Sequence, residues 1–122
     1  MNDRPASETL LLLRGDYVEL RSLCSQAEDD LKAAGQRKAE GEYALAKKIA
    51  TTRTVLLDAG ISRNEANDRA QDKAIDERYE VELALSAVRD AENAVRLLNH
   101  QLDTLQALGH FANREIKLEM AG

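Results

Sequence analysis

The sequence predicts an all-α protein built as one long antiparallel helical hairpin, a two-stranded coiled coil. Residues that favour helices dominate the composition, and the one proline, Pro5, lies near the N-terminus. Apolar residues recur three and four positions apart in both halves of the chain, which is the spacing of a coiled-coil interface. The signals that end one helix and begin another fall together near residue 60. These three observations predict two helices joined by a short turn.

The first helix is expected from about residue 7 to about residue 58. Its apolar residues fill alternating a and d positions of a seven-residue repeat, namely Leu10, Leu13, Tyr17, Leu20, Cys24, Ala27, Leu31 and Ala34. A helix with so narrow an apolar stripe buries it against a partner helix.

The turn is expected at about residues 59–61. Gly60 suits the left-handed conformation that often follows a helix, and Ile61 suits the apolar contact that accompanies it. Ser62 fits the N-cap of the next helix, and Glu65, three residues later, completes a capping box. A connection this short makes the two helices antiparallel.

The second helix is expected over about residues 62–119, with its interface at Ala84, Val88, Ala91, Val95, Leu98, Leu102 and Leu105. Folding near residue 60 pairs positions whose numbers sum to about 120, which brings Tyr17 near Leu102. Residues 62–72 hold few apolar side chains and are compatible with a separate short helix. Polar residues such as Lys38 and Glu77 interrupt the two interfaces, so a kink or loosened segment is expected there. The prediction is one domain over residues 1–122.

Net charge and cysteine content bear on which partners the protein binds and in which compartment it works. The net charge of −5 disfavours indiscriminate binding to nucleic acid. Cys24 is the only cysteine, so no internal disulfide can form, and its place on the apolar stripe predicts a buried, inert thiol. The N-terminus has no signal-peptide pattern, and the four leucines at 10–13 are too few to span a membrane. A cytoplasmic protein without a membrane partner is expected.

Catalytic and metal-binding motifs are not recognisable in the sequence. His100 and His110 are the only histidines, and no cysteine or carboxylate stands at a spacing that would complete a zinc site with either. There is no Gly-rich phosphate loop and no nucleophile motif. Carboxylates are scattered along both helices, without an isolated pair in an apolar run. We therefore expect no enzyme activity, no cofactor, no metal and no small-molecule substrate.

Some apolar residues lie outside the predicted interface and gather near the open end of the hairpin. They are Leu11, Leu12, Val18 and Leu23 on the first helix, and Leu97, Leu108, Phe111 and Leu118 on the second. A two-helix hairpin buries one stripe per helix, so a second stripe stays exposed unless another chain covers it. We predict a partner or oligomer interface at Leu11, Val18, Leu97, Leu108, Phe111 and Leu118. A twofold dimer forming a four-helix bundle is the simplest such assembly, and a locally wider helix interface is the alternative.

A basic stretch in the first helix is a candidate nucleic-acid contact. It comprises Lys32, Arg37, Lys38, Lys47, Lys48 and Arg53, against only Glu40 and Glu42 between its ends. Tyr43 is the one aromatic residue inside it, whereas single-strand binding sites usually stack several bases on aromatic rings. An ordinary solvated helix face is the other interpretation.

A resemblance to known proteins covers about residues 60–119. The segment Arg63–Ala70, then Glu77-Arg78-Tyr79 and a helix rich in Leu, Ala and Glu, resembles small phage and prophage coiled-coil proteins encoded among replication and recombination genes. Asn67 stands where the pattern of that family has an acidic residue. The resemblance implies an accessory or assembly role and no catalytic residue.

Three functions compete on these observations. The first is a non-catalytic coiled-coil interaction or adaptor protein, phage-encoded, which binds a protein partner, itself, or both. The second is a nucleic-acid-binding recombination or replication accessory protein that uses the basic stretch. The third is a small helical inhibitor of a host enzyme, because an acidic helical rod would fit a basic groove.

Overall fold

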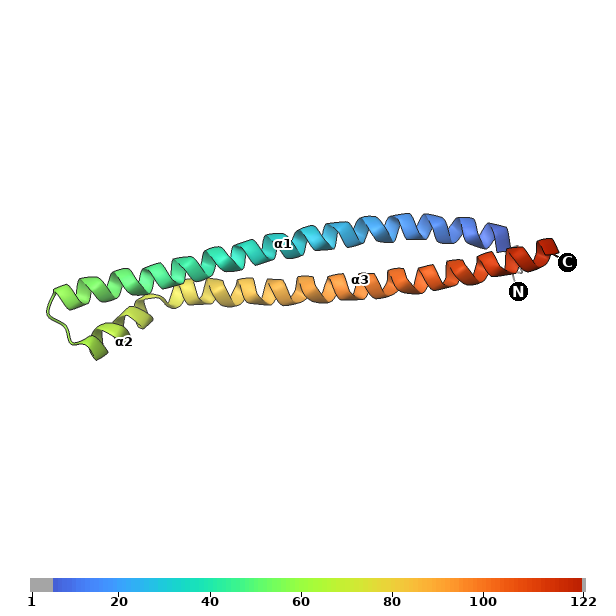
Figure 1. Ribbon diagram of the computed structural model, residues 1–122. Coiled ribbons are helices and arrows are strands. Elements are labelled where there is room, and N and C mark those ends of the chain that lie inside the picture. Colours follow the sequence, from blue (N-terminus) through green and yellow to red (C-terminus); the bar gives the residue numbers. More distant parts are fainter. Residues whose placement is uncertain (1–5, 122) are drawn as a thin grey trace. The chain divides into compact units, whose positions relative to one another are not determined.

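The computed structural model describes residues 6–121, which form three helices and no strand (Figure 1). Helix α1 spans Ala6–Asp58, α2 spans Arg63–Lys73 and α3 spans Ile75–Ala121. The predicted all-α helical hairpin is confirmed, since α1 packs against α3. The remaining residues of the expected 1–122 domain, 1–5 and 122, lie outside the described part.

The turn after α1 has the geometry that the sequence predicts. Gly60 has a φ of 86°, which a residue with a side chain adopts only at a cost. The Ile61 N–H donates to the Leu56 carbonyl at 3.1 Å, and the Gly60 N–H donates to the Leu57 carbonyl at 3.0 Å. These two bonds are the Schellman motif, which satisfies carbonyls that the end of the helix leaves free.

The N-cap of α2 is also where the sequence places it. The Glu65 N–H donates to the Ser62 hydroxyl oxygen at 3.4 Å. The carboxylate of Glu65 accepts a hydrogen bond from Arg69 Nη2 at 2.6 Å, four residues along the same helix. The first bond of the predicted capping box, from the Glu65 N–H to the Ser62 hydroxyl oxygen, is therefore present.

The second arm is divided at Ala74, so the continuous helix expected over 62–119 is two helices. The Ala74 N–H donates to Gln71, three residues back, and Ala74 has φ −99° and ψ 15°. This geometry ends α2, and α3 leaves at an angle to it (Figure 1). The separate short helix considered for residues 62–72 is observed. Helix α1 runs through Lys38 without a break, so the discontinuity expected in mid-chain lies only in the second arm, close to Glu77.

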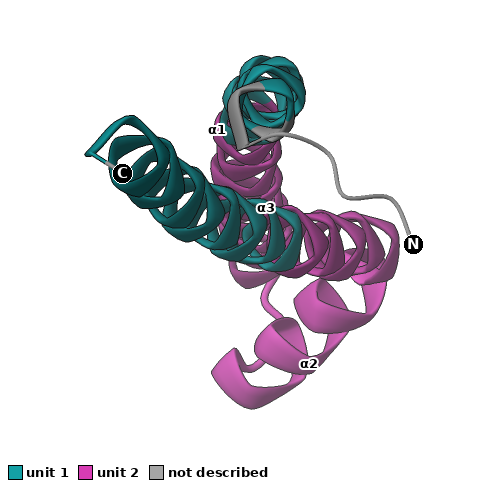
Figure 2. Ribbon diagram, turned by 90° about the vertical axis from the view of Figure 1, so that its right-hand side faces the viewer, with its two compact units in different colours: residues 1–29, 92–122 teal, residues 30–91 magenta. Residues whose placement is uncertain are grey.

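The chain divides into two compact units (Figure 2). In unit 1, residues 6–29 of α1 lie antiparallel to residues 92–121 of α3, and Cys24, Ala27 and Ala112 are buried. Unit 2 holds residues 30–91, which are the rest of α1, α2 and the start of α3. Its buried residues are Ala66, Ala70, Ala74 and Ala84. Buried alanines in each unit let the helices approach closely, while the larger interface residues are half-buried.

The residues of α1 face residues of α3 that lie slightly later in the sequence than expected. In unit 1, Gln106 Nε2 donates to the Tyr17 hydroxyl at 3.4 Å, so Tyr17 faces Gln106 rather than Leu102. In unit 2, a Cβ on Gly41 would lie 3.4 Å from Val81 Cγ2. The residue numbers of the two facing pairs add to 123 and 122, whereas a sum of about 120 was expected. The turn is centred later because Gly60 and Ile61 both belong to the Schellman motif before Ser62 begins α2.

Candidate interaction surface

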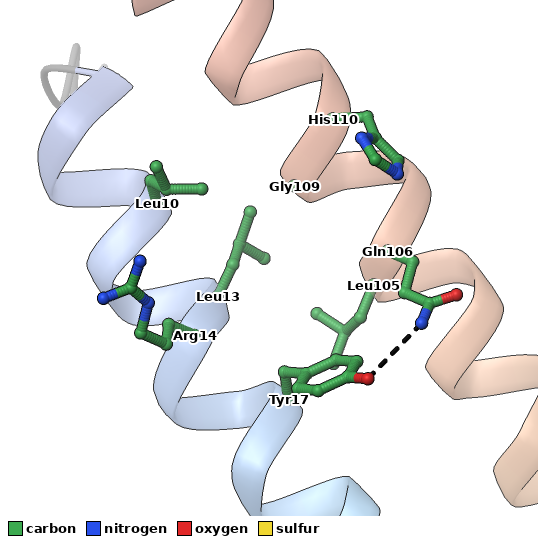
Figure 3. A pocket seen from close by; sticks show the side chains of 8 residues that line it. All are labelled: Leu10, Leu13, Arg14, Tyr17, Leu105, Gln106, Gly109 and His110. Atoms are coloured by element: carbon green, nitrogen blue, oxygen red, sulfur yellow. Dashed lines mark hydrogen bonds between the residues drawn. The ribbon is translucent and has the colours of Figure 1, made fainter.

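Unit 1 has a groove along each side of its helix pair. One, of about 450 Å³, is lined by Leu10, Leu13, Arg14, Tyr17, Leu105, Gln106, Gly109 and His110 (Figure 3). The other, of about 460 Å³, is lined by Asp16, Glu19, Leu20, Leu23, Gln101, Thr104 and Leu105. Arg14 and Gln106 border the first groove, whereas Glu19 and Gln101 border the second. These positions flank the interface stripe on opposite sides, so the grooves lie on opposite sides of the contact between the helices.

Tyr17 bridges the first groove. Its hydroxyl oxygen accepts hydrogen bonds from Arg21 Nη1 at 3.2 Å and from Gln106 Nε2 at 3.4 Å (Figure 3 shows the second). The bond from Arg21, and then that from Gln106, lowers the pKa of the Tyr17 phenol from its ordinary value of 10.0, because both donors stabilise the phenolate. The side chain is half-buried, and the shift reflects polar contacts, first with Arg21 of α1 and then with Gln106 of α3, rather than an activated group.

The apolar side chains around the second groove form what we call the Phe111 face. Leu23 lines that groove, and Leu12 is seven residues before Glu19, on the same side of α1. On α3, Leu97, Phe111 and Leu118 lie at seven-residue steps from Thr104, and Leu108 lies seven residues after Gln101. The members are Leu12, Leu23, Leu97, Leu108, Phe111 and Leu118, and their exposed fractions are 47, 48, 58, 50, 60 and 67%.

The apolar side chains beside the first groove form a smaller surface, the Val18 face. Val18 lies four residues after Arg14, which lines this groove, and Leu11 lies three residues before it, so all three share one side of α1. Leu11 is 67% exposed and Val18 is 64% exposed. On α3 this side carries His110 and, seven residues on, Lys117.

The six residues predicted as one interface are therefore all exposed and all in unit 1, but they do not form one surface. Leu97, Leu108, Phe111 and Leu118 belong to the Phe111 face, whereas Leu11 and Val18 belong to the Val18 face. Leu12 and Leu23, which the sequence showed outside the helix interface, complete the Phe111 face. The two apolar sets separate because they lie on opposite sides of the contact between α1 and α3.

The two faces differ in charge. The Phe111 side of unit 1 carries the acids Asp16, Glu19 and Glu115, and the one base beside it is Arg114, three residues after Phe111. The Val18 side carries Arg14 and Arg21 on α1 and Arg96 and Lys117 on α3, with the acids Glu28, Glu92 and Asp103. Around Leu11 and Val18 themselves the bases predominate. The contrast was not among the features predicted from the sequence, although the same seven-residue steps reveal it.

The candidate nucleic-acid residues all lie in unit 2, on α1. Arg37 Nη2 and Glu80 Oε2 form an ion pair at 3.5 Å between α1 and α3, and Lys38 Nζ pairs with Glu42 Oε1 at 3.7 Å. Four other bases, Lys32, Lys47, Lys48 and Arg53, are exposed. Unit 2 holds 11 bases and 12 acids between residues 30 and 91, so its formal net charge is −1. Acids on α2 and α3 offset most of the positive charge of the basic stretch.

Other chemical sites are sparse in the described residues. Cys24 is buried and free, as predicted. His100 and His110 are both exposed. Among residues 6–121 no group of three or more His, Cys, Asp or Glu side chains is placed to hold a metal ion. Over the same range no helix combines the length and the apolar character needed to cross a membrane.

Comparison of the chain with protein-family models, with curated proteins and with solved structures found no match.

Proposed function

We propose that this chain is a non-catalytic helical interaction protein, which works by binding protein through the exposed apolar side chains of unit 1. The observation that carries the proposal is the Phe111 face. Its six apolar side chains remain between 47 and 67% exposed. Isolated exposed leucines are common on proteins, but several large apolar side chains exposed along the same side of two helices mark a site of association.

The energetics of the Phe111 face support this proposal. Fully burying one leucine or phenylalanine side chain contributes roughly 1.5–3 kcal/mol. Since these side chains are about half exposed, covering each of them would contribute roughly 1 kcal/mol. Phe111 is the most promising anchor, because aromatic residues dominate the energies of many interfaces.

The biological setting belongs to the same proposal. The resemblance of residues 60–119 to phage and prophage proteins supports an accessory role in the cytoplasm, beside replication and recombination proteins. An adaptor of this kind requires no catalytic residue and no cofactor. Inhibition of a host enzyme is a particular case, in which the protein bound is that enzyme.

Affinity capture with matched variants tests the proposal. The parent, Phe111→Asp and Tyr43→Asp are used as baits in lysate of the cells that express the chain, and light scattering follows self-association of the same three proteins. Tyr43 is 70% exposed but lies in unit 2, so Tyr43→Asp adds the same charge away from the Phe111 face. We expect a complex, with the chain itself or with another protein, that Phe111→Asp loses and Tyr43→Asp keeps. If all three baits behave alike, the Phe111 face is not the binding surface.

Direct binding to nucleic acid is the second candidate, and four exposed bases of α1 favour it. Lys32, Lys47, Lys48 and Arg53 form no ion pair with another described residue. If they contact phosphates, Lys47→Glu with Lys48→Glu should abolish binding to a single-stranded oligonucleotide, and added salt should weaken it steeply. We expect little binding at physiological salt, because unit 2 carries no net positive charge. Tight, salt-sensitive binding there would favour this candidate over the first.

A further inference from the structure

We propose that the Phe111 face of one copy binds the Val18 face of a second copy, so that the chain associates head to tail. This inference rests on the proposed function and names the partner. Unit 1 has two apolar surfaces on opposite sides of one helix pair. Each surface is too exposed to be part of the hairpin's own core: Phe111 is 60% and Val18 is 64% exposed.

Charge determines which surfaces can meet. On the Phe111 face, the acids Asp16, Glu19 and Glu115 outnumber the one base beside it, Arg114, and no described residue forms an ion pair with them. If two copies met through this face alone, these acids would be brought together while water was excluded. Like charges in that arrangement oppose association.

The Val18 face would meet the opposite difficulty with itself. Arg14 and Arg21 flank Val18 on α1, and Lys117 lies on the same side of α3, with Asp103 as the nearby acid. Contact between the two different faces removes both conflicts, because Arg14, Arg21 and Lys117 then approach the acids of the Phe111 face. The same contact covers Leu11 and Val18 together with the larger apolar stripe. Apolar complementarity and charge complementarity therefore favour the same pairing.

This pairing predicts a distinctive mode of assembly. A contact between unlike faces leaves one free face at each end, so further copies add until the chain of contacts closes into a ring or continues as a filament. The mass of the assembly should rise with protein concentration. A contact between like faces would stop at a twofold dimer, which is the arrangement that the sequence alone suggested.

Mixing two variants tests the inference. In Phe111→Asp only the Val18 face remains competent, and in Val18→Asp only the Phe111 face remains competent. Each variant alone should sediment as a monomer, with self-association weakened at least tenfold from the parent. An equimolar mixture should form a dimer of one copy of each and nothing larger, because each variant supplies the face that the other lacks. Sedimentation velocity measures all three samples and the parent.

Controls keep the outcome interpretable. Circular dichroism verifies that each variant is folded, and Leu118→Asp with Leu11→Asp is a second pair, one on each face. Tyr43→Asp should associate like the parent. If one of the two variants alone remains a dimer, the contact joins like faces and the inference is wrong. If the mixture remains monomeric although each substitution dissociates the parent assembly, the two faces do not bind each other and the inference is again wrong. If the parent is itself a monomer at high micromolar concentration, the inference is also wrong, while the affinity capture still decides whether the Phe111 face binds another protein.

Discussion

Glycines inside α1 and the glycine of the turn that follows it should respond to the same substitution in opposite directions. Gly60 has a φ of 86°, and an L-residue in the left-handed region is disfavoured by roughly 1–2 kcal/mol. Gly60→Ala should therefore lower the free energy of unfolding by about 1 kcal/mol, after allowance for the stiffer unfolded chain. Gly60→Val, which adds a β-branched side chain, should lower it by about 1–2 kcal/mol.

Gly35 is the matched control, because it lies inside α1 and a Cβ added there would have open space around it to a distance of 4 Å. Gly35→Ala should raise the free energy of unfolding by about 0.5–1 kcal/mol, since glycine is a poor helix former. Gly41→Ala should gain less, because its Cβ would meet Val81 Cγ2 at 3.4 Å.

Urea denaturation followed by circular dichroism in the helical band measures these differences. Gly35, Gly41 and Gly60 all lie in unit 2, so one transition reports on all of them. The expected order of stability is Gly35→Ala, then Gly41→Ala, then the parent, then Gly60→Ala and Gly60→Val. If Gly60→Val unfolds at the same urea concentration as the parent, the left-handed turn does not contribute to stability. The reasoning also fails if Gly60→Ala is stabilised as much as Gly35→Ala.

Three further predictions concern the helix interface at Leu98, the buried carboxylate oxygen of Glu77 and the phenol of Tyr17. Leu98→Asp should lower the free energy of unfolding by about 2–4 kcal/mol, because it places a charge in the helix interface. Leu97 is 58% exposed, so Leu97→Asp should melt within a few degrees of the parent when unfolding is followed by circular dichroism. Glu77 Oε2 is buried without a hydrogen-bond partner, so Glu77→Leu should raise the free energy of unfolding by about 1 kcal/mol and move the urea midpoint to a higher concentration. A lower midpoint would contradict this. The lowered pKa of Tyr17 means that the folded state favours the phenolate, so this contribution to stability is present above pH 10 and is lost as pH falls through the folded-state pKa. Ultraviolet titration, with Tyr17→Phe subtracted, should give a midpoint that rises in Arg21→Gln; an unchanged midpoint would exclude Arg21 as the main cause.

Local signals in the sequence determined the helices and the turn between them. The three- and four-residue spacing of apolar side chains specifies an interface along each helix, whatever the partner is. Gly60, Ile61 and Ser62 specify a stop and a start, because the Schellman motif and the N-cap are made by residues within a few positions of one another. The exposure of Leu97, Phe111 and the other surplus apolar residues also followed from their positions outside the repeat.

The tertiary structure decided that the second arm breaks at Ala74, which the sequence left as one of two possibilities, and which exposed residues of the two helices share a face. Ala74 is a strong helix former, so nothing in its own preference predicts the break; the break accompanies the burial of Ala66, Ala70 and Ala74 in unit 2. Leu11 and Leu97 are both outside the interface, but whether they share a side depends on how two antiparallel helices face each other. That relation joins residues far apart in the sequence, and it separates an acidic apolar face from a basic one.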